Sequence, residues 1–321
     1  MTVLILARDI DTHVDDVVME LNKRAVPAFR TDLAAFPSSL SLTATLDADG
    51  WSGTLSNAHR SVDLREIDAV WYRHPSHFLI SDRMSRPERR HAAAEARVGV
   101  AGVLAGLNAR WMNHPARESA MFKPRQLDVA RRCGMAVPAT LVTNAPDAVT
   151  RFAADVVGGP LASKNLTGAA MVESGQLKTA FTRRLQPEDL TDLRGIDTTA
   201  HLFQQFIDKA HEVRLTCVGS QVFAAAIHAA TDPARIDFRT DYDALTYAPI
   251  DPPPHILNGM RRFMAEFDIT FGAFDFAVTH DGEWIMFECN PFGAYQWLEA
   301  AVGLPITAAI ADVLTGKDQP E

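Results

Sequence analysis

The chain has 321 residues, of which 47% are apolar and 22% charged, a balance typical of globular proteins with a sizeable core. Its net charge of -9 argues against a general nucleic-acid-binding protein, because phosphate contacts need a basic surface. The three cysteines, Cys133, Cys217 and Cys289, are widely spaced and lack metal-ligand spacing, so we expect buried free thiols in a reducing cytosol.

The N-terminal part has the pattern of a parallel α/β unit. Residues 2–7, TVLILA, predict a buried strand, residues 13–24 a helix, and residues 26–32 a second strand. Neither a dinucleotide-binding GxGxxG motif nor a P-loop is present. The first apolar run is too short for a signal peptide, and no run approaches membrane-spanning length. We therefore expect a cytoplasmic protein with no membrane partner.

The next segment continues this unit with alternating and helical patterns. Residues 41–56 alternate as a β-hairpin does, with Asp49–Gly50 as the turn signal. Residues 67–75, IDAVWYRHP, predict another strand. The Ala-, Arg- and Glu-rich stretch from residue 87 to 107 predicts a helix, and Pro115 indicates a boundary.

The rest of the chain divides into predicted helices and strands. The helices are expected at residues 117–132, with Gly134 as a cap, at 147–156, from the DPPP sequence to Phe267, and at 303–314. The strands are expected at residues 136–143, 201–207 and 212–229, and residues 158–166 are expected to form a loop and a strand. These elements suggest three units of ordinary domain size, at residues 1–115, 116–200 and 201–321.

A second hairpin is predicted near the C-terminus, and its strands carry acidic residues within an otherwise apolar sequence. FGAFDFAVT (271–279) and WIMFECNPFG (284–293) are strand-like, and Asp281–Gly282 between them is a two-residue turn signal. If these two residues form the turn, then Asp275 lies directly opposite Glu288. Burial of unpaired charges is costly, and like charges at opposed positions are destabilising. A positive partner should therefore lie between them.

The same register predicts the two faces of the hairpin. The core face is expected to hold Phe274, Phe276, Val278, Ile285, Phe287 and Cys289. The other face holds Asp275, Glu288 and Asn290, with Ala273 opposite Asn290. Three oxygen ligands of this kind suit Mg²⁺, which prefers carboxylates, waters and phosphates. The alternative is an exposed hairpin face whose acids are simply solvated.

With these motifs, the chain resembles the ATP-grasp superfamily and, within it, the graspetide (microviridin-type) peptide maturases. FDF with Asp275 and FECNP with Glu288 and Asn290 match the residues that hold Mg²⁺ on ATP in that superfamily. The resemblance implies an α/β fold with a parallel N-terminal βαβ domain, a small central α/β lid domain and a C-terminal α+β part. That last part would carry an antiparallel nucleotide-binding sheet.

The resemblance also implies the residues that bind the nucleotide. Lys123 in MFKPRQLDVA and Lys164 in GGPLASKNLTG match the two lysines that bind the triphosphate. Either lysine could instead be a solvated surface residue. LFQQFIDKAHEVRL matches the hinge segment, in which adenine is expected to meet Gln205 and the backbone of Phe206 and Ile207.

Further residues in matching segments are expected at the ribose and at the reacting groups. The resemblance assigns Glu212 to the ribose hydroxyls, and it implies that Arg214, Arg239 and Lys164 are catalytic. Glu212 and Arg214 are two residues apart and share a strand face, so the alternative is an exposed salt-bridged edge. Arg239 in RIDFRTDYD is the candidate for the transferred phosphate or the substrate carboxylate. Asp237 could serve the substrate or be the structural partner of Arg239. Arg73 could touch a peptide or only pack beside Tyr72.

Two features of the family pattern are not fixed by this sequence. Many ATP-grasp proteins have a Gly-rich loop after the second lysine, whereas here only Gly168 and Gly175 occur, so the amides that cap the phosphates are not identified. A hydroxyl nucleophile would need a general base. His228 is the candidate for that base, and a core histidine is the alternative.

The implied activity is an ATP-dependent ligase that turns Asp or Glu side chains of a ribosomal precursor peptide into acyl phosphates. A Thr or Ser hydroxyl or a Lys amine would then form an ω-ester or ω-amide crosslink. The resemblance further implies ATP and Mg²⁺ as cofactors, a precursor peptide with a leader segment as partner, and a homodimer. The alternatives are a RimK-like ligase that adds an amino acid to a carboxylate, and a non-catalytic nucleotide-binding protein.

Overall fold

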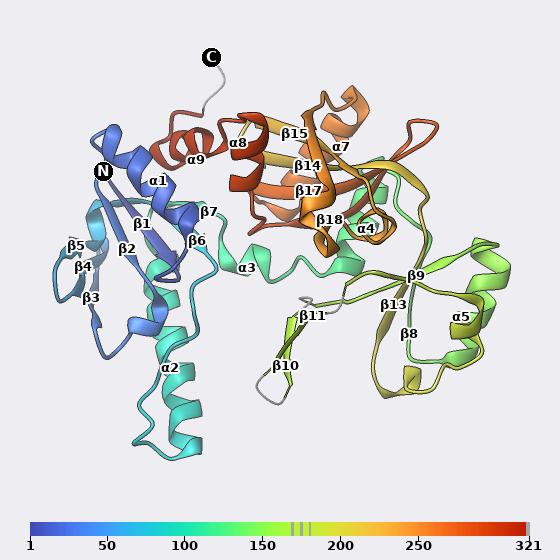
Figure 1. The fold of residues 1–321 in the computed structure, drawn as a ribbon. Coiled ribbons are helices and arrows are strands. Elements are labelled where there is room, and N and C mark those ends of the chain that lie inside the picture. Colours follow the sequence, from blue (N-terminus) through green and yellow to red (C-terminus); the bar gives the residue numbers. More distant parts are fainter. Residues whose placement is uncertain (168–169, 174–175, 180, 319–321) are drawn as a thin grey trace.

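The computed structural model of the protein describes residues 1–167, 170–173, 176–179 and 181–318. Three regions follow one another along the chain, each built around its own sheet (Figure 1). The described part of the chain contains no helix with the length and apolar character needed to cross a membrane.

The N-terminal region is a parallel sheet in the order β2-β1-β6-β7, which confirms the predicted βαβ opening. Every residue of β1 is buried, because α1 and α9 cover one face of the sheet while α2 and the small β3-β4-β5 sheet pack on the other. The elements are β1 (Thr2–Ala7), α1 (Thr12–Lys23), β2 (Ala28–Thr31), β3 (Leu40–Asp47), β4 (Gly50–Asn57), β5 (Ser61–Asp63), β6 (Ile67–Arg73), α2 (Arg86–Ala105) and β7 (Arg110–Met112).

The hairpin between β3 and β4 turns one residue earlier than predicted. Asp47 pairs with Gly50, so the two connecting residues are Ala48 and Asp49, and the prediction of Asp49–Gly50 is wrong. Gly50 has a φ of 100°, a conformation that glycine adopts without steric cost. The glycine is therefore needed at the first position of the strand rather than within the turn.

The single helix predicted for residues 117–132 is divided in two, α3 (Pro115–Glu118) and α4 (Lys123–Arg132). Pro124 lies near the N-terminus of α4. Inside a continuous helix it would remove a hydrogen bond and its ring would clash with the carbonyl of residue 120. The helix therefore restarts at Lys123, and Gly134 ends it in the left-handed conformation with a φ of 81°, as expected.

The central region is an antiparallel sheet in the order β12-β9-β13-β8, with a helical segment packed on it. β13 belongs to this sheet, because it pairs with both β8 and β9. A separate two-stranded hairpin, β10-β11, precedes β12, while Gly168 and Gly175 lie outside the described residues. The elements are β8 (Thr140–Thr143), α5 (Pro146–Arg151), the π-helical η3 (Phe152–Val157), β9 (Leu161–Lys164), β10 (Ala170–Glu173), β11 (Gln176–Thr179), β12 (Arg183–Arg184) and β13 (His201–Gln205).

The C-terminal region is a five-stranded antiparallel sheet in the order β16-β15-β14-β17-β18. Helices α4 and α7 cover one face, where Phe263, Phe274 and Phe276 are fully buried. The other face opens toward the central region (Figure 1). The elements are β14 (Lys209–Val218), β15 (Gln221–Ala229), α6 (Asp232–Ile236), β16 (Leu245–Pro249), α7 (Pro254–Phe267), β17 (Phe271–Thr279), β18 (Trp284–Asn290), α8 (Gln296–Val302) and α9 (Ile306–Thr315).

Candidate functional site

The acidic hairpin forms with the predicted pairing at the acids, although the turn differs from the prediction. Asp275 lies opposite Glu288, as expected. The nitrogen of Thr279 donates to the carbonyl of Glu283 at 2.9 Å, so the loop has three residues rather than two, and the prediction of a turn at Asp281–Gly282 alone is wrong. Further along, β18 carries a bulge, because Asp275 pairs with Glu288 but the next residue of β17 pairs with Met286. The longer loop and the bulge each shift the pairing by one residue in opposite directions, so the predicted pairing is restored at Asp275 and Glu288.

The bulge falls on Phe287 and changes the predicted faces of β18. Trp284 and Met286 join Cys289 in the core cluster, while Ile285 pairs with Ala277. The predicted face of Ile285 and the predicted core position of Phe287 are therefore wrong, since one extra residue reverses the alternation between them, while Ile285 is buried as expected, at 6% exposure. Phe287 lines the cavity beside the acids instead. The three cysteines are buried and free, as predicted.

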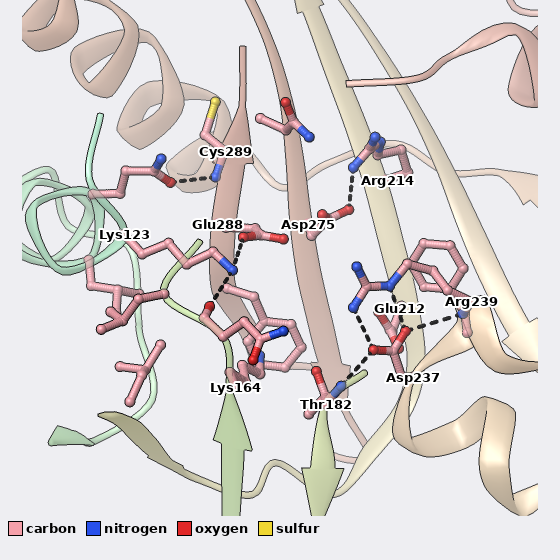
Figure 2. Close-up of a pocket in the computed structure, with 18 of the residues that line it drawn as sticks. Lys123, Lys164, Thr182, Glu212, Arg214, Asp237, Arg239, Asp275, Glu288 and Cys289 are labelled. Atoms are coloured by element: carbon pink, nitrogen blue, oxygen red, sulfur yellow. Dashed lines mark hydrogen bonds and ion pairs between the residues drawn. The ribbon is translucent and has the colours of Figure 1, made fainter. Parts of the chain in front are cut away.

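Three charged residues form a row across neighbouring strands. Arg214 on β14 lies opposite Asp275 on β17, which lies opposite Glu288 on β18 (Figure 2). Nη1 of Arg214 donates to Asp275 at 2.7 Å, and Nη2 donates to the carbonyl of Ala294 at 3.2 Å. Gly293 permits this approach, because a Cβ there would lie 2.9 Å from Nη2 of Arg214. The row is thus held by strand pairing and by the loop after β18.

The two carboxylates have opposite pKa shifts. Burial, together with the repulsion from Glu288, raises the pKa of Asp275, and Arg214 only partly opposes this. Burial also acts to raise the pKa of Glu288, but the charges of Lys123, Lys164 and Arg239 outweigh it, and the net pKa lies below its usual value. Two carboxylates are therefore confined together in a partly buried space where a further cation would relieve their repulsion.

The donor atoms at this point suit Mg²⁺. Within the described ranges, no group of three or more His, Cys, Asp and Glu side chains is gathered that could hold a metal by itself. Mg²⁺ is usually held by one or two carboxylates together with waters and phosphates, which matches Asp275 and Glu288. Asn290 is exposed, and its Oδ1 accepts from the nitrogen of Phe292 at 2.9 Å, which leaves a second lone pair on that oxygen.

The two predicted lysines lie beside Glu288 (Figure 2). Nζ of Lys123 lies 3.0 Å from Glu288 and donates to the carbonyl of Asn165 at 2.9 Å. Nζ of Lys164 lies 3.7 Å from the ring centre of Phe287. Burial lowers the pKa of Lys164 to about 8, although Glu288 acts in the opposite direction. The structure therefore brings two ammonium groups from different regions of the chain to one cavity, where Lys123 is paired with Glu288 and Lys164 lies over Phe287.

A third lysine at this site was missing from the predicted set. Lys209 pairs with Glu212 at 2.6 Å, and the side chains of both are about a tenth exposed. A regular strand would place these residues on opposite faces, but β14 has a bulge at Ala210 that turns both toward the cavity. Burial raises the pKa of Glu212, and Lys209 opposes that shift. The signal in the sequence was the DKAHE run, whose bulge the alternation alone does not reveal.

The hinge segment differs from the prediction by one residue. Gln204 is 2% exposed, lines the cavity and donates to Thr140 at 3.0 Å, whereas Gln205 is exposed and does not line it. The nitrogen of Phe206 already donates to the carbonyl of Pro160 at 2.9 Å, and neither Phe206 nor Ile207 lines the cavity. The strand alternation therefore presents the side chain of Gln204, and not that of Gln205, to the cavity.

Arg239 and Asp237 form a fixed pair on the side of Asp275 and Glu288 that is opposite to Lys123 (Figure 2). Nε and Nη2 of Arg239 donate to Asp237 at 2.8 and 2.6 Å, and the nitrogen of Thr182 donates to the same carboxylate at 3.0 Å. Burial acts to raise the pKa of Asp237, but these bonds lower it to about 2. The hydrogen bond to Asp237 likewise raises the pKa of Arg239. This geometry supports the structural role expected as an alternative for Asp237.

Two predicted residues lie away from the cavity. Arg73 is 6% exposed and donates to the carbonyl of Phe292 at 2.6 Å, which supports packing rather than contact with a peptide. His228 is exposed on β15, and its ring lies 5.1 Å from that of His211. The prediction that His228 is a core residue is wrong, because the outward face of β15 meets solvent there, and it does not reach the cavity as a base would have to.

One cavity of about 890 Å³ joins these groups between the central and C-terminal sheets. It also contains Glu118, a residue that the sequence patterns did not indicate, whose pKa burial raises to about 9. Most of the predicted site residues line this cavity, namely Lys123, Lys164, Glu212, Arg214, Asp237, Arg239, Asp275, Glu288 and Asn290. Cations at one side, paired acids in the middle and a guanidinium at the other can bind a polyphosphate and a carboxylate together.

Comparisons with known proteins agree with this arrangement. A family model described as "MvdD pre-ATP grasp domain" matches residues 2–119, and no curated protein matches the chain. The macrocyclase MdnC of Microcystis aeruginosa, solved with its precursor peptide MdnA, is 30% identical, with a TM-score of 0.86 over 98% of this chain and 100% of that one. The macrocyclase MdnB of the same organism is 30% identical, with a TM-score of 0.81 and 98% of each chain covered.

A third similar structure comes from Chryseobacterium gregarium. It is a RiPP-associated ATP-grasp ligase in complex with ADP and a leader and core peptide. Its sequence is 26% identical, and the TM-score is 0.91 with 100% of this chain and 98% of that chain covered. The likeness therefore extends over all three regions of the fold.

Proposed function

Because the chain belongs to the ATP-grasp macrocyclases, we propose that it crosslinks a ribosomally made precursor peptide at the expense of ATP. ATP would activate Asp or Glu side chains of the peptide, and hydroxyl or amine side chains of the same peptide would then form ω-esters or ω-amides. The observation that carries this proposal is the row of Arg214, Asp275 and Glu288, with lysines at one side and Arg239 at the other.

We assign the phosphates of the nucleotide to the side of the cavity that holds Lys123 and Lys164, and the ribose to Glu212. Lys123 and Lys164 would contact the phosphate oxygens, and Glu212, held by Lys209, would accept from the ribose hydroxyls. Gln204, rather than Gln205, is the side chain we expect near the adenine, because it is the one that faces the cavity. Backbone groups of Phe206 and Ile207 could join it only if this segment moves when the nucleotide binds.

We assign the metal to Asp275, Glu288 and Asn290, and Mg²⁺ bound there would neutralise charge on the phosphates. Arg214 then acts as a positioning residue, since two of its nitrogens are already committed to Asp275 and to a backbone carbonyl. It would keep the Asp275 carboxylate ionised and aimed at the cavity despite its burial.

Arg239 is assigned to the reacting carboxylate. Its Nε and Nη2 are bound by Asp237, while Nη1 makes no hydrogen bond to the protein within the described part of the chain. A side-chain carboxylate held there would attack the γ-phosphorus as the bond to the bridging oxygen of ADP breaks. The hydroxyl or amine would next attack the acyl carbon and lose its proton, and phosphate would leave with one carboxylate oxygen.

The test is mass spectrometry of a short candidate precursor peptide, rich in Thr and in Asp or Glu, incubated with the protein, ATP and Mg²⁺. We expect the loss of one water for each bond and one ADP released for each water lost. ADP release that depends on a free amino acid, with no change in the peptide mass, would instead indicate a RimK-like ligase. The homodimer, the cytoplasmic location and the domain boundaries expected from the sequence stay predictions.

A further inference from the structure

Four aromatic residues line the cavity on the side of Arg239, and the reaction described above does not use them. We call Phe238, Tyr242, Tyr247 and Trp297 the aromatic wall. Their rings contact one another in series, with centroid distances of 6.5 Å from Phe238 to Tyr242, 6.3 Å from Phe238 to Trp297 and 5.0 Å from Tyr247 to Trp297. They come from the short helices η6 (Phe238–Thr240) and η7 (Tyr242–Ala244), from β16 and from α8.

The aromatic wall covers a small apolar cluster and still leaves apolar surface in the cavity. The cluster beneath it has only three buried members, Ile227, Ala234 and Leu245. Phe238, Tyr247 and Trp297 are only partly buried, and Tyr242 is 62% exposed at the rim. Contact between such rings and an apolar group of a ligand is favourable, because it removes apolar surface from water. The wall is therefore suited to receive a ligand group of that kind.

The position of the wall indicates which ligand would supply this group. Phe238 directly precedes Arg239, the guanidinium assigned to the reacting carboxylate. Trp297 lies three residues after Ala294, whose carbonyl accepts a hydrogen bond from Arg214. Lys123 and Lys164, which are assigned to the phosphates, lie on the opposite side of Asp275 and Glu288, whereas Glu212, assigned to the ribose, lies on the same side as Arg239 (Figure 2). The group at the wall would thus belong to the molecule that carries the carboxylate.

We propose that the aromatic wall is a specificity subsite for a ring-bearing side chain of the peptide, located two positions from the acid that is activated. In an extended peptide, side chains two residues apart point to the same side at a separation of about 6.6 Å. One such segment could therefore place its acid at Arg239 and its ring on the wall. This inference rests on the proposed function, and it narrows the substrate to acids that have an aromatic neighbour.

The experiment compares three synthetic peptides by saturation-transfer NMR, in the presence of Mg²⁺ and a non-hydrolysable ATP analogue. The first is acetyl-Gly-Phe-Gly-Glu-Gly-amide, the second has Ala in place of Phe, and the third has Gln in place of Glu. We expect the Phe-to-Ala change to weaken binding roughly three- to tenfold, the range of a single ring contact. Saturation should reach the Phe ring protons most strongly.

Variants of the protein assign the effect to the wall. Trp297→Leu and, at the exposed rim, Tyr242→Ser should reduce the preference for Phe, whereas Trp51→Leu in the N-terminal region should keep it. Affinity for the nucleotide analogue should be unchanged in all three variants, which shows that they are folded. Equal binding of the Phe and Ala peptides, with the Gln peptide much weaker, would overturn the subsite and leave the ligase proposal intact. Equal binding of the Glu and Gln peptides, or no binding of any peptide, would overturn the carboxylate assignment itself.

Discussion

Replacing Lys164 by Met should make the free protein more stable while it weakens nucleotide binding. Burial lowers the pKa of this lysine from 10.5 to about 8. At neutral pH the ammonium is still charged, and the shift corresponds to roughly 3 kcal/mol of unfavourable free energy in the folded state. The contact with the Phe287 ring, at 3.7 Å, returns about 1 kcal/mol.

The cost of burying the ammonium exceeds the gain from the ring contact, so the Lys164→Met protein should be the more stable one. A Met side chain fills a similar space and can also pack on an aromatic ring. We therefore expect the free energy of unfolding to rise by about 2 kcal/mol at neutral pH. The gain should shrink as the pH rises above about 8, because the native lysine then loses its proton and its cost disappears. Affinity for an ATP analogue with Mg²⁺ should fall at least about tenfold, the effect of one charge-assisted contact.

Urea denaturation at neutral and alkaline pH, combined with calorimetric titration of the nucleotide analogue, measures both effects. Lys23→Met is the matched control, since that side chain is 75% exposed and its replacement should change stability by less than about 0.5 kcal/mol. A Lys164→Met protein that is less stable than the native one at neutral pH would refute the argument that this ammonium is held at a cost for the sake of its ligand.

Three further predictions concern other parts of the site. Glu288→Gln should abolish peptide-dependent ADP release and keep the circular dichroism spectrum; surviving turnover would contradict the metal assignment. The pKa of Asp237 lies at about 2, below its usual 3.8, so its stabilising effect is complete above about pH 4 and is lost as the pH falls toward 2. Asp237→Asn should remove that part of the acid dependence and free Arg239, and an unchanged acid-unfolding curve would contradict the pairing. Gln204→Ala should weaken the nucleotide affinity measured by calorimetry, whereas Gln205→Ala should not, and the reverse result would restore the original assignment.

The acidic pair could be predicted from sequence because strand pairing and residue types agree there. The predicted register of the hairpin was nevertheless correct at Asp275 and Glu288 only because two deviations cancel. The loop is one residue longer than its turn signal indicates, and the bulge at Phe287 adds one residue to the opposite strand. Such bulges depend on packing between strands, which no local pattern encodes. Phe287 was assigned to the core for this reason.

The dependence on contacts between strands also explains why Lys209 and Gln204 were missing from the predicted site. Glu212 and Lys209 are three residues apart, and only the bulge in β14 turns them to one face. Between Gln204 and Gln205, the orientation depends on how β13 pairs with β8 and β9, strands that are far away in sequence. The order of strands and helices was largely predictable because apolar periodicity is a local signal.

The central claim is that a peptide carboxylate is phosphorylated by ATP, and oxygen transfer tests it most directly. A precursor peptide whose Asp and Glu side-chain oxygens are labelled with ¹⁸O is incubated with the protein, ATP and Mg²⁺, and the released phosphate is analysed by mass spectrometry. The account predicts one labelled oxygen in phosphate for each crosslink formed. Crosslinked peptide accompanied by unlabelled phosphate would contradict it.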